Sequence, residues 1–388
     1  MTRALSQCDL AAVRVGKESE WNLLHVASYC GHAGMVMLLL ECGVDKDEDG
    51  RGWYGRGGWS PFVTPLWMAC EKGHLEIVRL LVEAGADKDK ANNTDGATPL
   101  LIASQKGYLE IGRLLVNAGA DKDKADKDGW TPFFMASQNG YIEIVRLLVD
   151  AVAEKDKANE LGQTPLFIAC ERLHLEIVRL LVDAGADKDK ADNDGRTPLW
   201  KVCREGHLKI VLLLIEAGAD KDKAKNTDGA TPLYVASQEG HLEIVRLLIE
   251  KGADKDKAIH DGRTPLWMAS QNGHLEIVRL LVEAGTDKDK ARNTDGVTPM
   301  FIASRNSHLE IVRLLIEKGA DKNKAMNGGE TPLFMASQEG QLEVVRLLVE
   351  KGADKNKARK GGSTPLDMAR RMGHSAVVAL LERAGATS

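Results

Sequence analysis

A segment of 33 or 34 residues recurs along this chain from Asn22 to the C-terminus, and this recurrence constrains the fold more than any other feature. A clear copy is 261–287, with the sequence DGRTPLWMASQNGHLEIVRLLVEAGTD. Thr-Pro dipeptides mark the copies, and they begin at Thr64, Thr98, Thr131, Thr164, Thr197, Thr231, Thr264, Thr298, Thr331 and Thr364. A period of this length is typical of solenoid proteins, in which each repeat is one supersecondary unit that stacks on its neighbours.

Each copy predicts two helices. Thr264 suits the N-cap of the first helix, and Pro265 suits its first turn, because an N–H there would have no helical partner. Gly273 ends this helix, since glycine adopts the left-handed conformation at little cost. In the second helix, HLEIVRLLVEAG, the charged residues form one narrow stripe, so most of the helix surface must be buried. Stacking between two neighbouring helical pairs provides that burial.

A polar, extended segment joins one helical pair to the next, as in DKDKA at 254–258, and a turn follows at Asp261-Gly262. We expect a short projecting β-turn or hairpin there. Acids and lysines alternate in the nine copies of this segment, so stacked copies are predicted to pair acid with lysine across repeats. Each exposed pair is worth less than about 1 kcal/mol, which favours a role in solubility and spacing over recognition.

The patterns DGxTPLxxAS and GHLEIVRLLVEAGAD and the 33-residue step resemble the ankyrin-repeat family over nearly the whole chain. The resemblance implies an all-α ankyrin-repeat solenoid of helix-turn-helix repeats with projecting β-turns or hairpins. Only His25 keeps the family's histidine after Thr-Pro-Leu. The other repeats carry Trp67, Leu101, Phe134, Phe167, Trp200, Tyr234, Trp267, Phe301 and Phe334 there. One large side chain per repeat favours packing between neighbours, and an exposed apolar stripe is the alternative.

The chain divides into a partial N-terminal cap at 1–20 and a repeat array at 21–388, with a Gly- and aromatic-rich insertion at 49–62 in the first inter-repeat loop. The atypical last repeat suits a C-terminal cap, because a terminal unit needs a polar outer face. We place the repeats at about 21–48, 63–94, 95–127, 128–160, 161–193, 194–227, 228–260, 261–294, 295–327, 328–360 and 361–388.

The insertion is the one stretch that the repeat pattern does not explain. It carries Trp53, Tyr54 and Trp59 together with Arg51 and Arg56. These residue types dominate binding hot spots, so the insertion predicts a binding loop. The alternatives are a loop whose aromatic rings fold back on the first repeats, or an artefact of the gene model.

Some substitutions fall at structurally sensitive positions. Leu173 replaces the glycine between two helices, and Val152 replaces the glycine that ends a second helix. A β-branched residue at positive φ costs about 1 kcal/mol or more, so we expect the turn at Val152 to be remodelled. Cysteines at the small-residue position of the first helix are predicted to be reduced packing residues. They are Cys70, Cys170 and Cys203.

The repeat at 194–227 departs most from the charge pattern of its neighbours. Lys201 stands where neighbouring repeats have Met or Ile, and Arg204 stands where they have Gln or Glu. Lys209 replaces a Glu, and Leu212 replaces an Arg. With Arg196 they are predicted to form a basic spot beside Trp200. A solvated face is one interpretation, and contact with an acidic partner is the other.

Residues that differ between nearly identical copies are candidates for recognition. They lie at the end of the first helix and in the turn before Thr-Pro, and by resemblance to ankyrin-repeat proteins these positions form a concave binding surface. The candidate protein-binding residues, including those of the insertion, are Trp53, Tyr54, Trp59, Glu71, Lys72, Gln105, Lys106, Trp130, Gln138, Asn139, Arg172, Arg196, Trp200, Lys201, Arg204, Glu205, Gln238, Glu239, Arg263, Gln271, Asn272, Arg305 and Asn306.

Charge and composition argue against several classes of protein. The formal net charge is −5, from 52 basic and 57 acidic residues, so no overall field favours nucleic acid or an anionic membrane. The sequence has no run of 18 apolar residues and no apolar signal core, which predicts a cytoplasmic protein without membrane insertion. A nuclear location is the alternative. The recurring histidines would lie about 10 Å apart, too far to share a zinc ion. No metal or other cofactor is expected.

No motif of catalysis is present, neither HExxH, paired CxxC nor a phosphate-binding glycine loop, so no enzyme is expected. We expect a monomeric, non-catalytic scaffold or adaptor that binds partner proteins on a preorganised surface. The alternative is a structural or self-associating elastic solenoid without a specific partner. Variation at the candidate positions favours the first, while the uniform second helices suit either.

Overall fold

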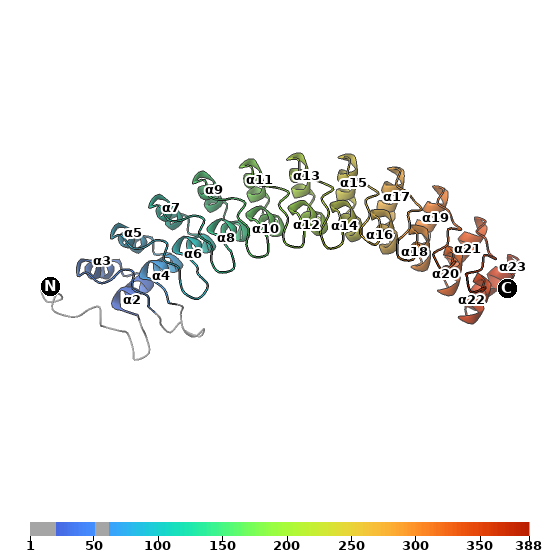
Figure 1. Ribbon diagram of the computed structural model, residues 1–388, viewed down its shortest axis with the longest axis horizontal. Helices are drawn as coiled ribbons and strands as arrows, with labels where there is room; N and C mark the ends of the chain where they lie inside the picture. The colour runs from blue at the N-terminus through green and yellow to red at the C-terminus, as the bar shows by residue number, and fades with distance from the viewer. Residues whose placement is uncertain (1–20, 51–61, 388) are drawn as a thin grey trace. The chain divides into compact units, whose positions relative to one another are not determined.

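The computed structural model describes residues 21–50 and 62–387. Over these residues the chain forms 22 helices and no strand, and the helices follow one another in pairs. The chain divides into two units, 1–193 and 194–388, each of which is a row of such pairs (Figure 1). The predicted all-α fold of helix-turn-helix repeats is confirmed.

In the first unit, the first helices of the pairs are α2 (Leu23–Cys30), α4 (Pro65–Lys72), α6 (Pro99–Lys106), α8 (Pro132–Asn139) and α10 (Pro165–Glu171). The second helices are α3 (Ala33–Glu41), α5 (Leu75–Glu83), α7 (Leu109–Asn117), α9 (Ile142–Asp150) and α11 (Leu175–Asp183). Within this unit each helix packs against its pair partner and against the corresponding helix of a neighbouring repeat.

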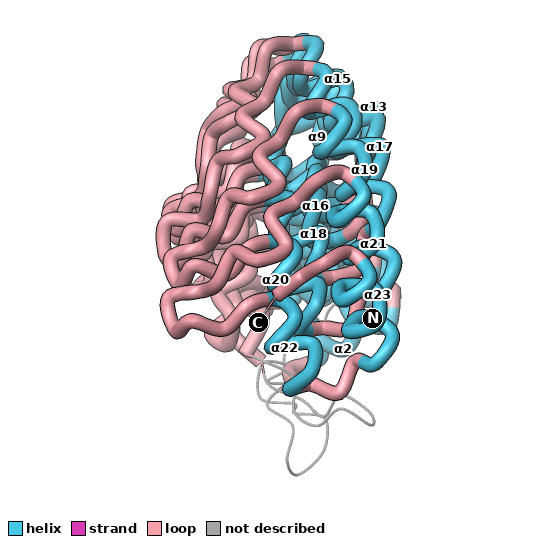
Figure 2. Tube along the Cα trace, turned by 90° about the vertical axis from the view of Figure 1, so that its right-hand side faces the viewer, coloured by secondary structure: helices cyan, strands magenta, loops and turns pink. Residues whose placement is uncertain are grey.

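In the second unit, the first helices are α12 (Pro198–Glu205), α14 (Pro232–Glu239), α16 (Pro265–Asn272), α18 (Pro299–Arg305), α20 (Pro332–Gln338) and α22 (Pro365–Arg371). The second helices are α13 (Leu208–Glu216), α15 (Leu242–Glu250), α17 (Leu275–Glu283), α19 (Leu309–Glu317), α21 (Leu342–Glu350) and α23 (Ser375–Arg383). The packing follows the same rule, and in each unit the inter-repeat loops lie along one side of the helices (Figure 2).

The ends of the first helices follow the prediction. In each Thr-Pro copy the threonine hydroxyl accepts a hydrogen bond from the main-chain N–H three residues later, as Trp267 N donates to Thr264 Oγ1 at 3.1 Å. Gly273 closes the same helix at a φ of 81°. Both ends of the helix are therefore fixed by local chemistry before any tertiary contact is made.

The turn at Val152 is not remodelled, so that prediction is wrong. Val152 has a φ of 56°, and its N–H bonds to Val149 O at 2.9 Å. The equivalent glycine, Gly85, bonds to Val82 O at the same distance. The Val152 side chain is 84% exposed, so no atom blocks the glycine-like geometry and the backbone strain persists. Leu173 and Ser307 also hold positive φ angles, the latter unanticipated.

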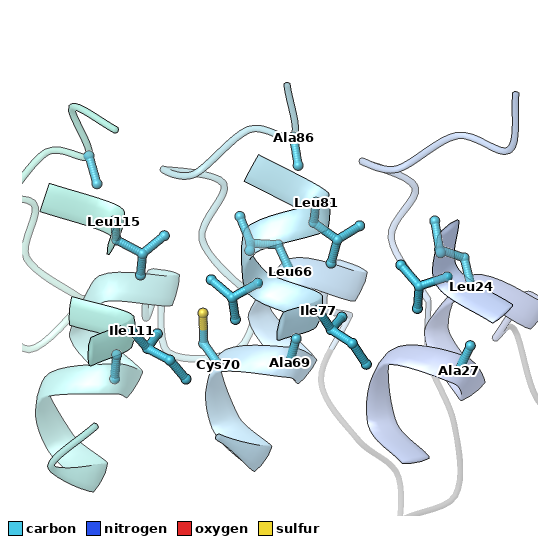
Figure 3. Packing of buried hydrophobic residues seen from close by; sticks show 14 of the residues in the cluster. Leu24, Ala27, Leu66, Ala69, Cys70, Ile77, Leu81, Ala86, Ile111 and Leu115 are labelled. Carbon is cyan, nitrogen blue, oxygen red and sulfur yellow. The ribbon is translucent and has the colours of Figure 1, made fainter. Parts of the chain in front are cut away.

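The main core lies between the two rows of helices. In the first unit Leu24, Leu66, Leu81 and Leu115 are at most 1% exposed and pack from successive repeats into one cluster (Figure 3). The cysteine prediction is confirmed for Cys70, whose buried thiol belongs to this cluster and has a raised pKa because burial disfavours the thiolate. Cys170 and Cys203 are likewise buried and unpaired.

A second apolar layer lies between the first helices and the turns. It contains the row of large side chains that replace the family's histidine, and all are buried: Trp67, Leu101, Phe134, Phe167, Trp200, Tyr234, Trp267, Phe301 and Phe334. The indole N–H of Trp267 reaches Val297 O in the next repeat at 2.9 Å. The packing interpretation of this row is therefore confirmed, and the exposed stripe is excluded.

The DKDKA segments join neighbouring repeats, but not by the predicted pairing of acid with lysine. Asp256 Oδ1 accepts the main-chain N–H of Asp287 at 3.0 Å, and Lys290 Nζ donates to Asp256 O at 2.8 Å. Main-chain groups outside helices need partners, and these side chains supply them. We call this arrangement the inter-repeat ladder. Its side-chain acceptors are Asp47, Asp89, Asp123, Asp156, Asp222, Asp256, Asp289, Asn323 and Asn356.

The projecting loops are turns without strands in the described parts of the chain. A main-chain hydrogen bond closes the base of most of them, as Asn92 N donates to Ala97 O at 3.0 Å, and further bonds lie within the turn. An isolated antiparallel bridge joins Gly50 to Val63. The predicted projecting turns are confirmed, and the predicted hairpins are not.

Candidate functional site

The candidate pairs occupy the last turn of each first helix. In α16, Gln271 is half-buried and Asn272 is exposed, and Gln105 and Lys106 of α6 show the same division. Because each helix is capped at both ends, these side chains start from a fixed place in every repeat. Gln138 and Gln238 are half-buried like Gln271, while the exposed members are Lys106, Arg172, Arg204, Glu205, Glu239 and Arg305.

The side-chain amides of three candidates form hydrogen bonds to a neighbouring repeat. Each is an asparagine whose Nδ2 group donates to a main-chain carbonyl at the first-helix end of the preceding repeat. The bonds are Asn139 to Gln105 (3.2 Å), Asn272 to Gln238 (2.8 Å) and Asn306 to Gln271 (2.9 Å). Their amides are committed within the array, which lowers their availability to a partner.

A histidine at the start of the second helix binds the same carbonyl. His274 Nε2 lies 3.0 Å from Gln238 O, an oxygen near a helix end that has no intrahelical donor. We call this contact the histidine clasp; it recurs at His74, His174, His241, His308 and His374. Sequence reasoning argued only that these histidines lie too far apart to share a zinc ion, and it assigned them no contact. Their constant place ten residues after the N-cap threonine was the signal for a shared contact in the Thr-Pro repeats.

The predicted basic spot of the 194–227 repeat is only partly assembled. The Arg204 guanidinium carbon lies 6.0 Å from the centroid of Trp200, which is 5% exposed. Lys201 pairs with Glu205 at 3.4 Å. Arg196 likewise forms an ion pair, with Asp194 at 2.8 Å. Lys209 and Leu212 belong instead to the second helix α13, where both are exposed.

Turn cations that sequence reasoning missed cover the buried tryptophans. Lys225 Nζ lies 5.7 Å from the Trp200 centroid, and the Arg292 guanidinium lies 5.3 Å from that of Trp267. Arg263, a predicted candidate, covers Trp267 from the preceding turn at 5.6 Å. Such cation–π contacts hold the long side chains against the protein. The sequence could have indicated these contacts through the residue after the DKDKA segment. This residue is Asn or Asp in the first unit and often basic in the second.

In the first unit the candidates have a different character. Trp130 stacks on Phe134, with ring centroids 6.3 Å apart and an angle of 8°, and remains half-exposed. In the same turn, burial raises the pKa of Asp126. Lys72 Nζ lies 4.5 Å from the ring centroid of Tyr29 and 3.9 Å from Glu71. Among the described candidates of this unit Trp130 is the aromatic anchor, and the others are amide, basic and acidic side chains.

The insertion candidates Trp53, Tyr54 and Trp59 lie outside the described residues. The two ends of the insertion are held together at its base, where Gly50 and Val63 exchange main-chain hydrogen bonds of 3.0 and 3.2 Å.

His25 lies beneath this base. Its Nε2 atom is 3.0 Å from Glu48 O and 3.1 Å from Val63 O, and a Cβ on Gly50 would come within 2.6 Å of the ring. Burial lowers the pKa of His25, an effect that the Val63 carbonyl and the Glu48 carboxylate oppose. The histidine therefore connects the first repeat to both ends of the insertion.

Residues 21–50 and 62–387 contain neither of two other kinds of site. No group of three or more His, Cys, Asp or Glu side chains is placed to hold a metal ion. None of the helices in these ranges is both long enough and apolar enough to cross a membrane.

Tandem helical pairs that pack on their neighbours and join through the ladder and the clasp define a helical repeat protein. The family model of ankyrin repeats, which describes three copies, matches residues 4–92, 58–126, 118–192, 152–225, 185–259, 255–326 and 323–387. The matches span nearly the whole chain, and the chain belongs to the ankyrin-repeat family. A comparison with curated proteins finds no match.

Proposed function

We propose that this protein is a non-catalytic scaffold or adaptor that binds partner proteins through the ends of its first helices and the adjoining turns. Ankyrin repeats generally mediate protein binding. One observation supports this surface in particular: apart from Trp200, the candidate residues, which differ between repeats in charge and polarity, are exposed or half-buried there, whereas the buried helix positions stay apolar or small. A rigid surface of this kind loses little conformational entropy when a partner binds.

Affinity purification with quantitative mass spectrometry tests the proposal, followed by binding measurements with the purified partner. The test variant combines Trp130→Ala and Arg204→Gln, because alanine and glutamine occupy these positions in other repeats, as at Ala97 and Gln238. The matched control is Arg279→Gln on the exposed side of α17. We expect the partner to bind the control and to be weakened about tenfold or more by the test variant. Equal binding to both would exclude this surface.

The insertion is a further candidate for the same function, and a chain without residues 51–61 tests it in the same purification. A partner lost on this deletion but retained by the surface variant would place recognition in the insertion.

A structural role without a specific partner is the second candidate, and the uniform ladder and clasp favour it. Sedimentation velocity separates the two functions. The binding proposal expects a monomer at all concentrations, while concentration-dependent association that survives the surface variant would support the structural role.

A further inference from the structure

The two units differ in charge. Residues 194–388 contain 30 basic and 27 acidic residues, a formal charge of +3, whereas residues 1–193 contain 22 and 30, a charge of −8. The formal net charge of −5 for the whole chain conceals this division. A partner that recognises charge would therefore distinguish one unit from the other.

The difference is sharpest in one row of side chains, at the penultimate or last residue of each first helix, which we call the first-helix row. In the second unit the row contains only arginine and glutamine: Arg204, Gln238, Gln271, Arg305, Gln338 and Arg371. In the first unit the equivalent positions from α4 to α10 hold Glu71, Gln105, Gln138 and Glu171. The row changes from acidic to basic, while its glutamines stay.

The three arginines of the row are available. Arg204, Arg305 and Arg371 are exposed, and no carboxylate lies within ion-pair distance of their guanidinium groups in the described parts of the chain. This distinguishes them from the arginines of the second helices, such as Arg279, which lies 3.4 Å from Glu276. An exposed guanidinium without an internal partner can bind a carboxylate at both oxygens.

The neighbouring turns add cations that are already held in place. Arg263 and Arg292 lie 5.6 and 5.3 Å from the ring centroid of Trp267, and Arg359 lies 5.9 Å from that of Phe334. Each also has an acidic neighbour, as Arg263 has Asp261 at 2.8 Å. These pairs leave little net charge in the turns, and they order the turn surface beside the first-helix row.

We infer that the first-helix row and turns of residues 194–388 bind an extended, acidic segment of a partner protein. This inference rests on the proposed function and specifies its partner. Packed first helices lie about 10 Å apart, which is about three residues of extended chain. Arg204 and Arg305 are three repeats apart, and Arg305 and Arg371 are two. The carboxylates of the partner should therefore be spaced about nine and about six residues apart.

The charge distribution favours a peptide over a nucleic acid. A nucleic-acid surface needs a dense basic stripe. Here one or two neutral glutamines separate the arginines of the first-helix row, and the turn cations have acidic neighbours. The second unit carries only three excess positive charges.

Fluorescence anisotropy with the full chain tests this inference. The probe is a labelled 17-residue Gly/Ser peptide with glutamate at positions 1, 10 and 16, and its control has glutamine at those positions. The test variant is Arg204→Gln with Arg305→Gln, because glutamine occupies this position in neighbouring repeats. The matched control is Arg246→Gln with Arg279→Gln, which makes the same change in charge on the second helices.

We expect the test variant to weaken binding of the glutamate peptide about tenfold, the matched control to leave it within twofold, and the glutamine peptide to bind no better than the test variant. Added salt should weaken binding. Equal binding of both peptides, insensitivity to the test variant, or tighter binding of a single-stranded RNA of the same length would overturn the inference. If a captured protein still binds the test variant normally, the inference fails while the proposed function stands.

Discussion

At the scale of single residues, the positive φ angles of non-glycine residues in the described ranges fall where the chain lacks an expected glycine. Val152, Leu173 and Ser307 have φ angles of 56°, 64° and 63°. The repeat pattern identified the first two as exceptions. It could not show whether the turn would change its geometry or the residue would adopt a positive φ angle. The turn keeps its geometry because main-chain bonds and buried neighbours on both sides fix it: Leu148 is fully buried and Ala153 is 8% exposed.

Val152→Gly should therefore stabilise its repeat. Left-handed backbone costs a non-glycine residue about 1–2 kcal/mol, and glycine recovers most of this after its larger entropy loss on folding. We expect a gain of about 1 kcal/mol, measured as slower amide exchange in α9. Gly185→Val, the reverse change at an equivalent turn, should destabilise α11 by a similar amount. No change in either variant would show that these turns carry no strain.

Protonation of His25 should loosen the first repeat. Its pKa in the folded protein lies below the ordinary histidine value of 6.5, because burial penalises the charged ring. The neutral ring therefore stabilises the fold fully above about pH 6.5, and this contribution is lost as the pH falls through the lowered folded pKa. Amide exchange in α2, corrected for the intrinsic rate, should speed up below pH 6.5.

His25→Phe is the control, because Phe134 occupies the equivalent position and does not titrate. The pH effect should vanish in this variant. Slower exchange at low pH in the unmodified chain would show instead that the oxygen atoms around the ring, Asn22 Oδ1 among them at 2.8 Å from Nδ1, retain a second ring proton.

At the scale of elements, sequence reasoning predicted the helices and their ends well, because the determinants are local. Thr264 and Gly273 act within their own helix. The period of the apolar residues and their helix propensity locate the residues between. The contacts between repeats were predicted less well. Alternating charge in the DKDKA segment suggested pairs of side chains, yet Asp256 and Lys290 bind main-chain atoms, whose positions are set only by the stacking of repeats.

Loss of one ladder acceptor should destabilise one joint between repeats. Asp256→Ala leaves the Asp287 N–H without its partner, at a cost of about 1 kcal/mol, and should speed its amide exchange about fivefold. Asp256→Asn should keep the bond, because Asn323 Oδ1 accepts the N–H of Asp354 at 2.8 Å in the same arrangement. Equal effects of both substitutions would show that the carboxylate charge matters, and not the bond.

At the scale of the whole chain, stability should propagate between neighbours. Val278 is fully buried in α17, which packs against α15 and α19. Val278→Asp places a charge in the core, and we expect the repeats at 228–260, 261–294 and 295–327 to lose protection together. Circular dichroism melts and amide exchange test this. A melt identical to that of the unmodified chain would contradict the stacked core.

The candidate surface was only partly accessible from the sequence at this scale. Variation between repeats identified Arg204, Arg263 and Arg305, because it needs only one chain to be seen. It could not show that Asn272 is committed to a neighbouring repeat or that Arg292 covers Trp267, because both depend on which atoms meet between repeats.

The ladder and the clasp have a consequence for how such a chain can evolve. Every bond in them joins a side chain of the repeated motif to a main-chain N–H or carbonyl, a group that nearly every residue supplies. A joint of this kind does not require its neighbour to carry a matching side chain. When a gene duplicates or loses one whole repeat, the newly adjacent pair still finds its bonds. Repeat number can therefore drift without compensating mutations, and the near-identity of 228–260, 261–294 and 295–327 is consistent with recent duplication.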